Sequence, residues 1–205
     1  MPVFFLQEIN ATTKLGIWKI EEDEAFFKQR VSSHRIVTHP HKQLQHLAGR
    51  FLLKYLYPDF PSHLIQIADT RKPFLPDETY HFSISHCGDY AAAIVSKDHR
   101  VGIDIEIPTE KVIRIGDKFI SETERNMLQP ATTVDYTKIW SAKEAVFKWY
   151  SKGEVDFRKH IVIQSLDAAQ QAFKCVFTKT GSAINIGLAG FENFCLAFIA
   201  TRDKF

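Results

Sequence analysis

The stretch from residue 136 to 152 constrains the fold most, because it predicts a long helix that is apolar on nearly every side. A helix of this kind has to be enclosed by other elements rather than lie on a surface. One narrow polar stripe crosses it at helical spacing and contains Thr137, Ser141, Glu144, Lys148 and Ser151. Because buried charges need partners, we expect the stripe to face other polar groups. Gly153 is expected to end the helix.

Two interpretations of the charged pair on this stripe stay open. Glu144 and Lys148 lie four residues apart, and such a pair stabilises a helix by only about 0.2–0.5 kcal/mol. In the other interpretation, Glu144 presents a carboxylate to a metal ion while Lys148 presents an ammonium to a phosphate.

A second carboxylate group is predicted on the strand at residues 101–106. Asp104 and Glu106 are two residues apart and therefore point to the same face, whereas Val101, Ile103 and Ile105 point to the other. Two neighbouring carboxylates repel each other unless a proton or cation lies between them. The pair is either a solvated face of an edge strand or part of a Mg²⁺ site.

The rest of the chain predicts a mixed α+β fold. Alternating patterns predict strands at 3–9, 15–20, 80–86 and 90–96, and a helical pattern covers 44–56. An amphipathic segment follows at 111–119, and residues 161–201 are β-rich. Ser121 and Glu124 have the spacing of a capping box, so Glu124 has a structural role open to it.

Composition indicates a protein without nucleic-acid or membrane partners. The 26 basic and 24 acidic residues leave a net charge of +2, which argues against a general polyanion binder. No stretch approaches the ~20 apolar residues of a membrane span, and the N-terminus lacks the features of a signal peptide. Three widely spaced cysteines fit a reducing compartment, so we expect a cytoplasmic protein.

Five motifs in order resemble the 4′-phosphopantetheinyl transferases of the surfactin-synthetase-activating type. They are Arg71-Lys72-Pro73, Phe82-Ser83-Ile84-Ser85-His86, Gly102-Ile103-Asp104-Ile105-Glu106, Phe119-x₄-Glu124 and Trp140-Ser141-x-Lys143-Glu144-x₃-Lys148. The chain departs from the family at Arg71, where glycine is usual, and at Cys87, where serine is common. One motif alone would have little weight, but five in order are specific.

The resemblance implies two similar α/β lobes with a pseudo-twofold relation, at residues 1–100 and 101–205, with coenzyme A between them. It implies Mg²⁺-dependent transfer of the 4′-phosphopantetheine arm of coenzyme A to a serine of an apo acyl, polyketide or peptidyl carrier protein, releasing 3′,5′-ADP. A monomer is expected by the same resemblance.

The resemblance also assigns roles to single residues. It implies that Mg²⁺ is bound by Asp104, Glu106 and Glu144, and that Lys148 contacts the pyrophosphate. Lys72, Ser85 and His86 are implied at the nucleotide end, with His86 near the 3′-phosphate. Glu124 or a water on the metal would take the serine proton. The basic residues that hold the 3′-phosphate have no clear counterpart, and Arg50, Arg35 and Lys42 are candidates.

Two other functions remain open on sequence grounds. Asp/Glu pairs also serve Mg²⁺-dependent phosphoryl hydrolases such as pyrophosphatases and nucleases. A non-catalytic carrier-binding protein would keep the fold but lose some of the four charged residues Asp104, Glu106, Glu144 and Lys148, and all four are present.

Overall fold

A computed structural model describes residues 3–31 and 37–202. The chain divides into two compact units, Met1–Val101 and Gly102–Phe205, here called the N-terminal and C-terminal units. The fold is a mixture of helices and β-sheets, so the predicted α+β class is confirmed. No described helix is both long enough and apolar enough to cross a membrane.

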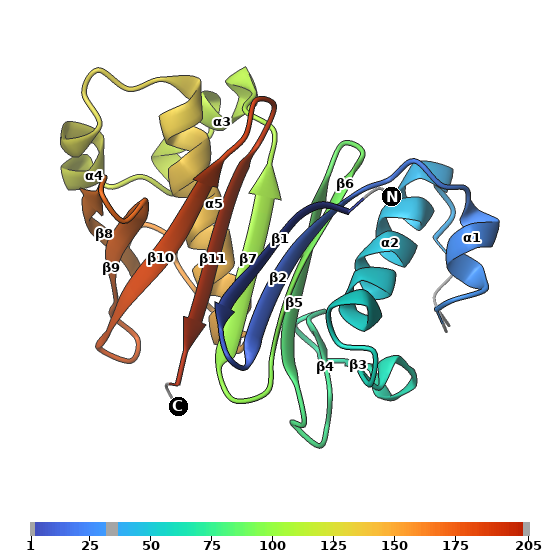
Figure 1. Cartoon of the computed structure of the whole chain (residues 1–205). Helices are drawn as coiled ribbons and strands as arrows, with labels where there is room; N and C mark the ends of the chain where they lie inside the picture. The colour runs from blue at the N-terminus through green and yellow to red at the C-terminus, as the bar shows by residue number, and fades with distance from the viewer. Residues whose placement is uncertain (1–2, 32–36, 203–205) are drawn as a thin grey trace. The chain divides into compact units, whose positions relative to one another are not determined.

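The N-terminal unit is built on a four-stranded antiparallel sheet with the order β1-β2-β6-β5 (Figure 1). Its elements in chain order are β1 (Val3–Asn10), β2 (Thr13–Lys19), α1 (Glu24–Lys28), α2 (Pro40–Leu56), η1 (Ser62–Leu64), β3 (Gln66–Ile67), β4 (Pro73–Phe74), β5 (His81–Cys87) and β6 (Tyr90–Ser96). The short strands β3 and β4 form a separate hairpin.

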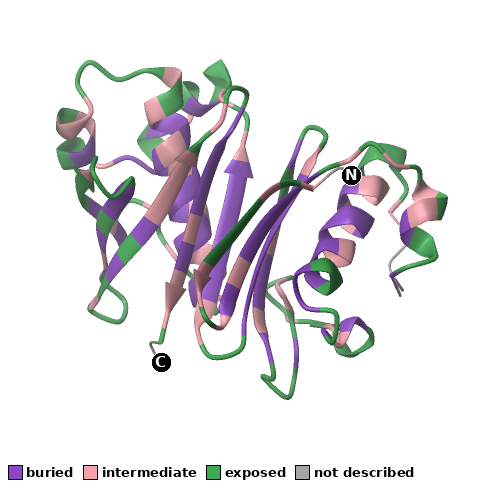
Figure 2. Ribbon diagram, viewed as in Figure 1, coloured by how far each residue is buried: buried purple, intermediate pink, exposed green. Residues whose placement is uncertain are grey.

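Helix α2 covers this sheet because its apolar residues recur on one face. Leu47, Leu52 and Leu53 are fully buried, and they pack with residues of β2 and β6 in a single hydrophobic cluster. In Figure 2 the side of α2 that faces the strands is buried and the opposite side is exposed. Pro40 begins the helix at a position where a missing backbone N–H costs nothing.

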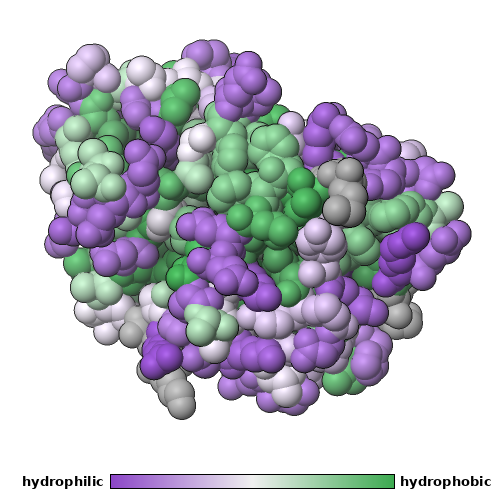
Figure 3. Space-filling view, in the orientation of Figure 1, coloured by the Kyte–Doolittle hydropathy of each residue, from purple (hydrophilic) through white to green (hydrophobic). Residues whose placement is uncertain are grey.

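The C-terminal unit is built on a five-stranded sheet with the order β7-β11-β10-β9-β8. Its elements are β7 (Arg100–Glu106), α3 (Glu110–Arg114), η2 (Gly116–Lys118), α4 (Glu122–Met127), α5 (Thr133–Tyr150), β8 (Ile161–Asp167), β9 (Ala172–Phe177), β10 (Ser182–Gly190) and β11 (Cys195–Thr201). The boundary between the two units lies within β7. Hydrophobic residues reach the surface on part of the face shown in Figure 3, among stretches of hydrophilic ones.

Helix α5 is the central element of this unit, as its apolar sequence predicts. Ile139, Val146 and Trp149 are fully buried in the cluster that joins α5 to the sheet. The helix begins at Thr133, earlier than predicted, because Thr132 and Asp135 form a capping box. The prediction that Gly153 ends it is wrong: Ser151 already adopts the left-handed conformation, with φ of 61°.

The amphipathic segment at 111–119 forms two short helices rather than one. Helix α3 ends at Arg114, and the chain continues as the 3₁₀ turn η2 from Gly116. A Cβ atom on Gly116 would lie 2.7 Å from the Tyr136 ring, so the glycine allows this turn to pack closely against α5. The capping box of Ser121 and Glu124 at the start of α4 is confirmed.

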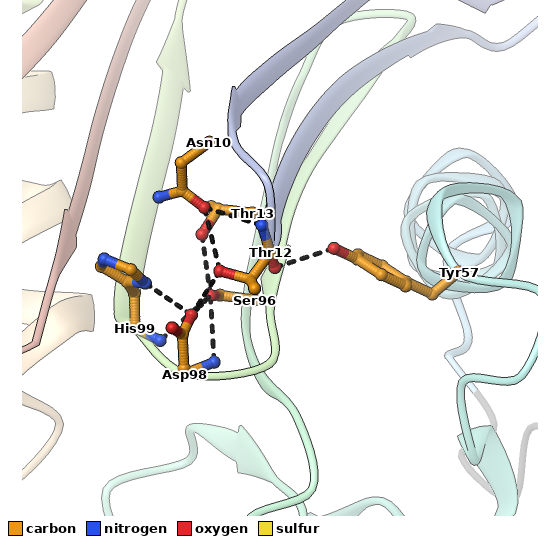
Figure 4. Close-up of polar contacts among 7 residues, drawn as sticks. All are labelled: Asn10, Thr12, Thr13, Tyr57, Ser96, Asp98 and His99. Atoms are coloured by element: carbon orange, nitrogen blue, oxygen red, sulfur yellow. Dashed lines mark hydrogen bonds and ion pairs between the residues drawn. The ribbon is translucent and has the colours of Figure 1, made fainter.

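A network of short polar side chains joins two turns of the N-terminal unit (Figure 4). Thr12, in the turn between β1 and β2, donates hydrogen bonds to Asn10 and Asp98. The Asp98 carboxylate also contacts His99 Nδ1 at 2.7 Å, and Ser96 Oγ accepts from the His99 backbone N–H at 3.0 Å. These bonds fix the chain immediately before it enters β7.

Candidate functional site

The site begins with the close approach of β7 to α5. A Cβ atom at Gly102 would lie 2.0 Å from the backbone oxygen of Ala145 and 2.9 Å from the backbone nitrogen of Trp149. Both neighbours are backbone atoms of a buried helix and have no freedom to rotate away. Glycine is therefore the residue that allows strand and helix to pack at this distance.

Because alternate residues of a strand point to the same face, both carboxylates of β7 point toward the helix that Gly102 approaches. Asp104 and Glu106 lie two and four residues beyond Gly102 and share its face of the strand. Asp104 is buried, with 2% of its surface exposed, and Glu106 is half-buried. The alternative of a solvated acidic face is therefore excluded for Asp104. Ile103 and Ile105 are buried on the opposite face.

Lys148 connects the helix to the strand. Its Nζ donates a hydrogen bond to Asp104 Oδ1 at 2.7 Å, and the two side chains are 24% and 4% exposed. The ammonium thus bridges α5 and β7 rather than serving only its own helix. Trp140, two turns earlier on α5, donates from Nε1 to Glu106 Oε1 at 3.4 Å.

The electrostatics place Glu144 among these groups. Burial raises the pKa of the Glu144 carboxyl to about 7, against an ordinary value of 4.5. The Lys148 ammonium opposes this rise in pKa, and the carboxylates of Asp104 and Glu106 add to it. The pKa of Glu106 is also raised, first by burial and then by Asp104. The charges of Asp104 and Glu106 thus act on Glu144, and the charge of Asp104 acts on Glu106.

The donor set fits a hard divalent cation. All three groups are carboxylates, which Mg²⁺ prefers, and a cation among them would relieve the repulsion that adds to the effect of burial on the pKa values of Glu106 and Glu144. Across residues 3–31 and 37–202, no three His, Cys, Asp or Glu side chains are gathered tightly enough to hold a metal ion as they stand. In the structure the positive charge next to Asp104 is the Lys148 ammonium.

A groove lies beside these groups within the C-terminal unit. It has a volume of about 690 Å³ and is lined by aromatic and aliphatic residues that include Phe119, Trp140 and Phe157. Four charged residues also line it, Asp117, Lys118, Asp156 and Arg158. Trp140 belongs both to the groove and to the contact with Glu106. The groove therefore adjoins the carboxylates.

Glu124 is buried, and both of its carboxylate oxygens are hydrogen-bonded within the protein. It is 0% exposed. Its Oε2 accepts from the backbone N–H of Ser121 and its Oε1 from that of Ile163, both at 2.8 Å. The Lys143 ammonium contacts both oxygens at 2.8 Å. Of the two roles open to Glu124, the structure favours the structural one and not that of a base at a substrate.

The sequence places Lys143 within the fifth motif, without a predicted role. The structure buries it completely, and its ammonium donates to Glu124 and to the backbone oxygens of Phe119 and Phe157, at 2.7 and 2.9 Å. Burial lowers its pKa, and Glu124 counteracts that. An isolated lysine surrounded by apolar positions was the available signal.

The predicted nucleotide-binding residues all lie in the N-terminal unit. On β5, Ser85 is buried and His86 is exposed. Because they are adjacent in a strand, they project to opposite faces, so the structure does not bring them together. Lys72 is half-buried next to β4. Burial is the main reason that the pKa of His81 is lowered, and the charges of Arg100 and Lys72 lower it further.

The basic candidates for the 3′-phosphate are partly described. Arg50 on α2 donates from Nη1 to His46 Nδ1 at 3.2 Å, and Lys42 is exposed near the start of the same helix. Arg35 lies outside the described residues.

Comparison with known proteins adds an independent observation. Residues 100–199 match the family described as ACPS, the 4′-phosphopantetheinyl transferase superfamily. The chain is 34% identical over 114 residues to enterobactin synthase component D of Salmonella austin, which covers 54% of this chain and 48% of that protein.

Two further relatives carry the family's name. The chain is 31% identical over 111 residues to 4′-phosphopantetheinyl transferase gsp of Aneurinibacillus migulanus, covering 52% of this chain and 46% of the relative. It is 40% identical over 85 residues to a 4′-phosphopantetheinyl transferase of Bacillus subtilis, covering 40% and 37%. The chain thus spans about half of the length of the enterobactin synthase component, and less than half of the length of the other two relatives. The resemblance predicted from the motifs is confirmed at the level of the superfamily.

Proposed function

Since residues 100–199 of this chain match the 4′-phosphopantetheinyl transferase superfamily, we propose that the protein transfers the phosphopantetheine arm of coenzyme A to a serine hydroxyl of an apo carrier protein. The observation that carries the proposal is the gathering of Asp104, Glu106, Glu144 and Lys148 at the contact between β7 and α5. In this reaction the serine oxygen bonds to the β-phosphorus of coenzyme A, and 3′,5′-ADP leaves.

The three carboxylates are proposed to hold Mg²⁺. When bound, the ion neutralises charge on the pyrophosphate and orients its oxygens. Lys148 would turn from Asp104 and donate a hydrogen bond to a phosphate oxygen, which would stabilise the negative charge that develops on the departing 3′,5′-ADP. The side chain needs only a short movement, because it is already partly exposed beside the carboxylates.

We do not assign the general base to Glu124. Both of its oxygens accept backbone hydrogen bonds and contact Lys143 in a fully buried position, so a carrier serine has no access to them. The serine proton has to be taken by another group at the site. This leaves Glu124 as a structural residue of the proposed enzyme.

The nucleotide end of coenzyme A is proposed to contact basic residues of the N-terminal unit. Lys72 is half-buried, and Arg50, Lys42 and His86 supply further donors. Ser85 would reach the nucleotide only if the ligand also passed the opposite face of β5. Each unit places one long helix on a sheet, α2 and α5, and this supports the proposed similarity of the two lobes.

The test combines the protein with Mg²⁺, coenzyme A and a panel of apo carrier proteins from fatty-acid, polyketide and nonribosomal-peptide systems. Mass spectrometry should show a gain equal to one phosphopantetheine arm on the carrier serine. Glu144→Gln should abolish the gain while circular dichroism shows an unchanged fold. Lys138→Gln, on the same helix outside the stripe, is the matched control.

The competing functions predict different outcomes. A Mg²⁺-dependent phosphoryl hydrolase would release phosphate from pyrophosphate or a nucleotide without a carrier. A non-catalytic carrier-binding protein would bind coenzyme A or a carrier and modify none of the panel. Transfer in the wild-type protein that survives unchanged in Glu144→Gln would contradict the proposed metal ligands.

A further inference from the structure

Lys143 and Glu124 form a closed ion pair that the proposed chemistry does not use. Both side chains are 0% exposed. The pair lies where five segments meet. Lys143 comes from α5 and Glu124 from α4, and their remaining bonds reach Phe119 after η2, Phe157 before β8 and Ile163 within β8. Every bond of the Lys143 ammonium therefore goes to a segment other than α5.

We infer that Lys143 is a positioning residue, which fixes the rotation of α5 about its axis so that Glu144 and Lys148 face the carboxylates of β7. The inference rests on the proposed function, because it concerns the same metal and phosphate groups. It assigns to the buried pair a role beyond the capping of α4.

Two different contacts restrain α5, and they restrain different motions. The absence of a side chain at Gly102 sets how closely the helix approaches β7, but this contact near Ala145 leaves rotation about the helix axis possible. Lys143 projects from another side of the helix into acceptors on three separate segments. Since these acceptors surround one ammonium, rotation of α5 would break bonds in a site closed to water.

The size of the effect follows from helix geometry. Side-chain groups lie about 5–6 Å from a helix axis, so a rotation of about 20° moves Glu144 by about 2 Å. A misplacement of about 1 Å can reduce a reaction rate about 100-fold. Glu144 follows Lys143 directly in sequence, so a rotation at one is transmitted to the other.

The test removes the restraint while keeping the volume of the side chain. Lys143→Met leaves the Glu124 carboxylate buried without its ammonium, which is expected to destabilise the fold. The double variant Lys143→Met/Glu124→Gln removes both charges and keeps an acceptor for the backbone N–H of Ile163. Lys138→Met makes the same change at a half-buried position of α5 and is the matched control.

Binding of Mn²⁺ alone, measured by electron paramagnetic resonance, reads the carboxylate geometry without any reaction. In the folded double variant we expect Mn²⁺ affinity to fall about tenfold or more. In the transfer assay, kcat should fall at least tenfold while KM for coenzyme A changes less than about twofold. The control should match the wild-type protein in both measurements.

Three results would overturn the inference. One is a folded double variant with wild-type Mn²⁺ affinity and kcat, which would make the pair purely structural. Another is loss of folding in both variants, which would show that the pair serves folding. The third is a wild-type protein that does not bind Mn²⁺. A wild-type protein that binds Mn²⁺ but transfers nothing refutes the proposed function instead, and the Mn²⁺ affinities then decide the inference alone.

Discussion

At the scale of single residues, the ionised Glu144 side chain lowers the stability of the metal-free folded protein. Burial and two neighbouring carboxylates raise its pKa to about 7 from 4.5. Between these two values the folded protein holds a proton that the unfolded chain releases, so stability falls as pH rises through this window. Below pH 4.5 both states are protonated and the cost disappears.

Glu144→Gln should therefore stabilise the metal-free protein at pH 8 and have little effect near pH 4.5. The difference of 2.5 pKa units (7 minus 4.5) sets an upper value on the order of 3 kcal/mol for the gain. Urea unfolding of both proteins at the two pH values, in the presence of a chelator, measures it. A variant that is equally or less stable at pH 8 would show that Glu144 is not held at an unfavourable position.

Lys148 is predicted to be important in two separate measurements. Lys148→Met removes the ammonium that contacts the buried Asp104 at 2.7 Å. Lys148 is partly exposed, so water can replace part of its contact with Asp104. We therefore expect a loss of about 1–3 kcal/mol in unfolding free energy. Transfer should fall by about 100-fold or more, since the departing phosphate loses its donor.

The matched control for Lys148→Met is Lys138→Met, which should leave both measurements near wild type. A Lys148→Met protein that loses stability but keeps its transfer rate would show that Lys148 serves the fold alone. Such a result would restore the simplest interpretation of the polar stripe, in which its charges only satisfy one another.

The sequence predicted the polar stripe but not which partner each charge has. Its spacing places Glu144 and Lys148 four residues apart, which favours a contact within the helix. The structure shows Lys148 bound to Asp104, 44 residues away in sequence. Periodicity reports which residues share a face and says nothing of the element opposite that face. For the same reason the partners of Lys143 could not be predicted.

At the scale of elements, the contact between β7 and α5 depends on Gly102. Gly102→Ala places a methyl group 2.0 Å from a backbone oxygen, so the strand and the helix have to separate. Overpacking of this kind typically costs about 1–3 kcal/mol, and we expect the upper end because the neighbour is backbone. Thermal unfolding measures the loss, and Mn²⁺ titration should show weaker binding.

Gly190→Ala is the matched control for this substitution. Gly190 also lies in a strand of the C-terminal unit, and a Cβ atom there meets nothing within 4 Å. Equal melting temperatures for the two variants would show that β7 and α5 tolerate separation, and that the glycine is not required for their packing.

Element types were more predictable than element ends. The strand at 90–96 has the bounds of β6, and the capping box at Ser121 has the predicted pair of bonds. The end of α5 was misplaced because Ser151, which is not a glycine, adopts positive φ. Buried strands and helices follow hydrophobic periodicity, whereas their ends depend on local hydrogen bonds that the pattern does not contain.

At the scale of the whole molecule, each unit has its own hydrophobic core. One cluster contains Leu52 and its neighbours in the N-terminal unit, and the other contains Trp149 and its neighbours in the C-terminal unit, with no residue in common. Leu52→Ala is expected to cost about 2–5 kcal/mol. We predict that amide hydrogens lose protection from exchange mainly in the unit that contains the substitution.

Hydrogen exchange with mass spectrometry tests this prediction. Exchange in Leu52→Ala should accelerate in peptides from residues 3–31 and 37–101, while peptides from 102–202 stay close to wild type. Ile186→Val, in the other core, is the reciprocal substitution and should give the opposite pattern. Uniform acceleration in both units would show that the chain unfolds as one cooperative body.

The units themselves were expected from the family resemblance and not from a visible repeat. Their helices α2 and α5 share no motif, since α2 carries His41 and His46 and α5 carries the polar stripe. A hydrophobic pattern allows many sequences for one architecture, so similar architectures need not share residues. The motifs predicted the superfamily that residues 100–199 match, but they contain no repeat that predicts two units.

The complete burial of Lys143 also makes it a chemical reporter. Amine-reactive reagents require an accessible, unprotonated amine, whereas the Lys143 ammonium donates to oxygen atoms of three residues at 2.7–2.9 Å. Exposed lysines such as Lys118 should be acylated rapidly in the native protein, whereas Lys143 should react only in molecules where α4, α5 and β8 have come apart. Its rate of labelling would then measure how often this part of the protein opens.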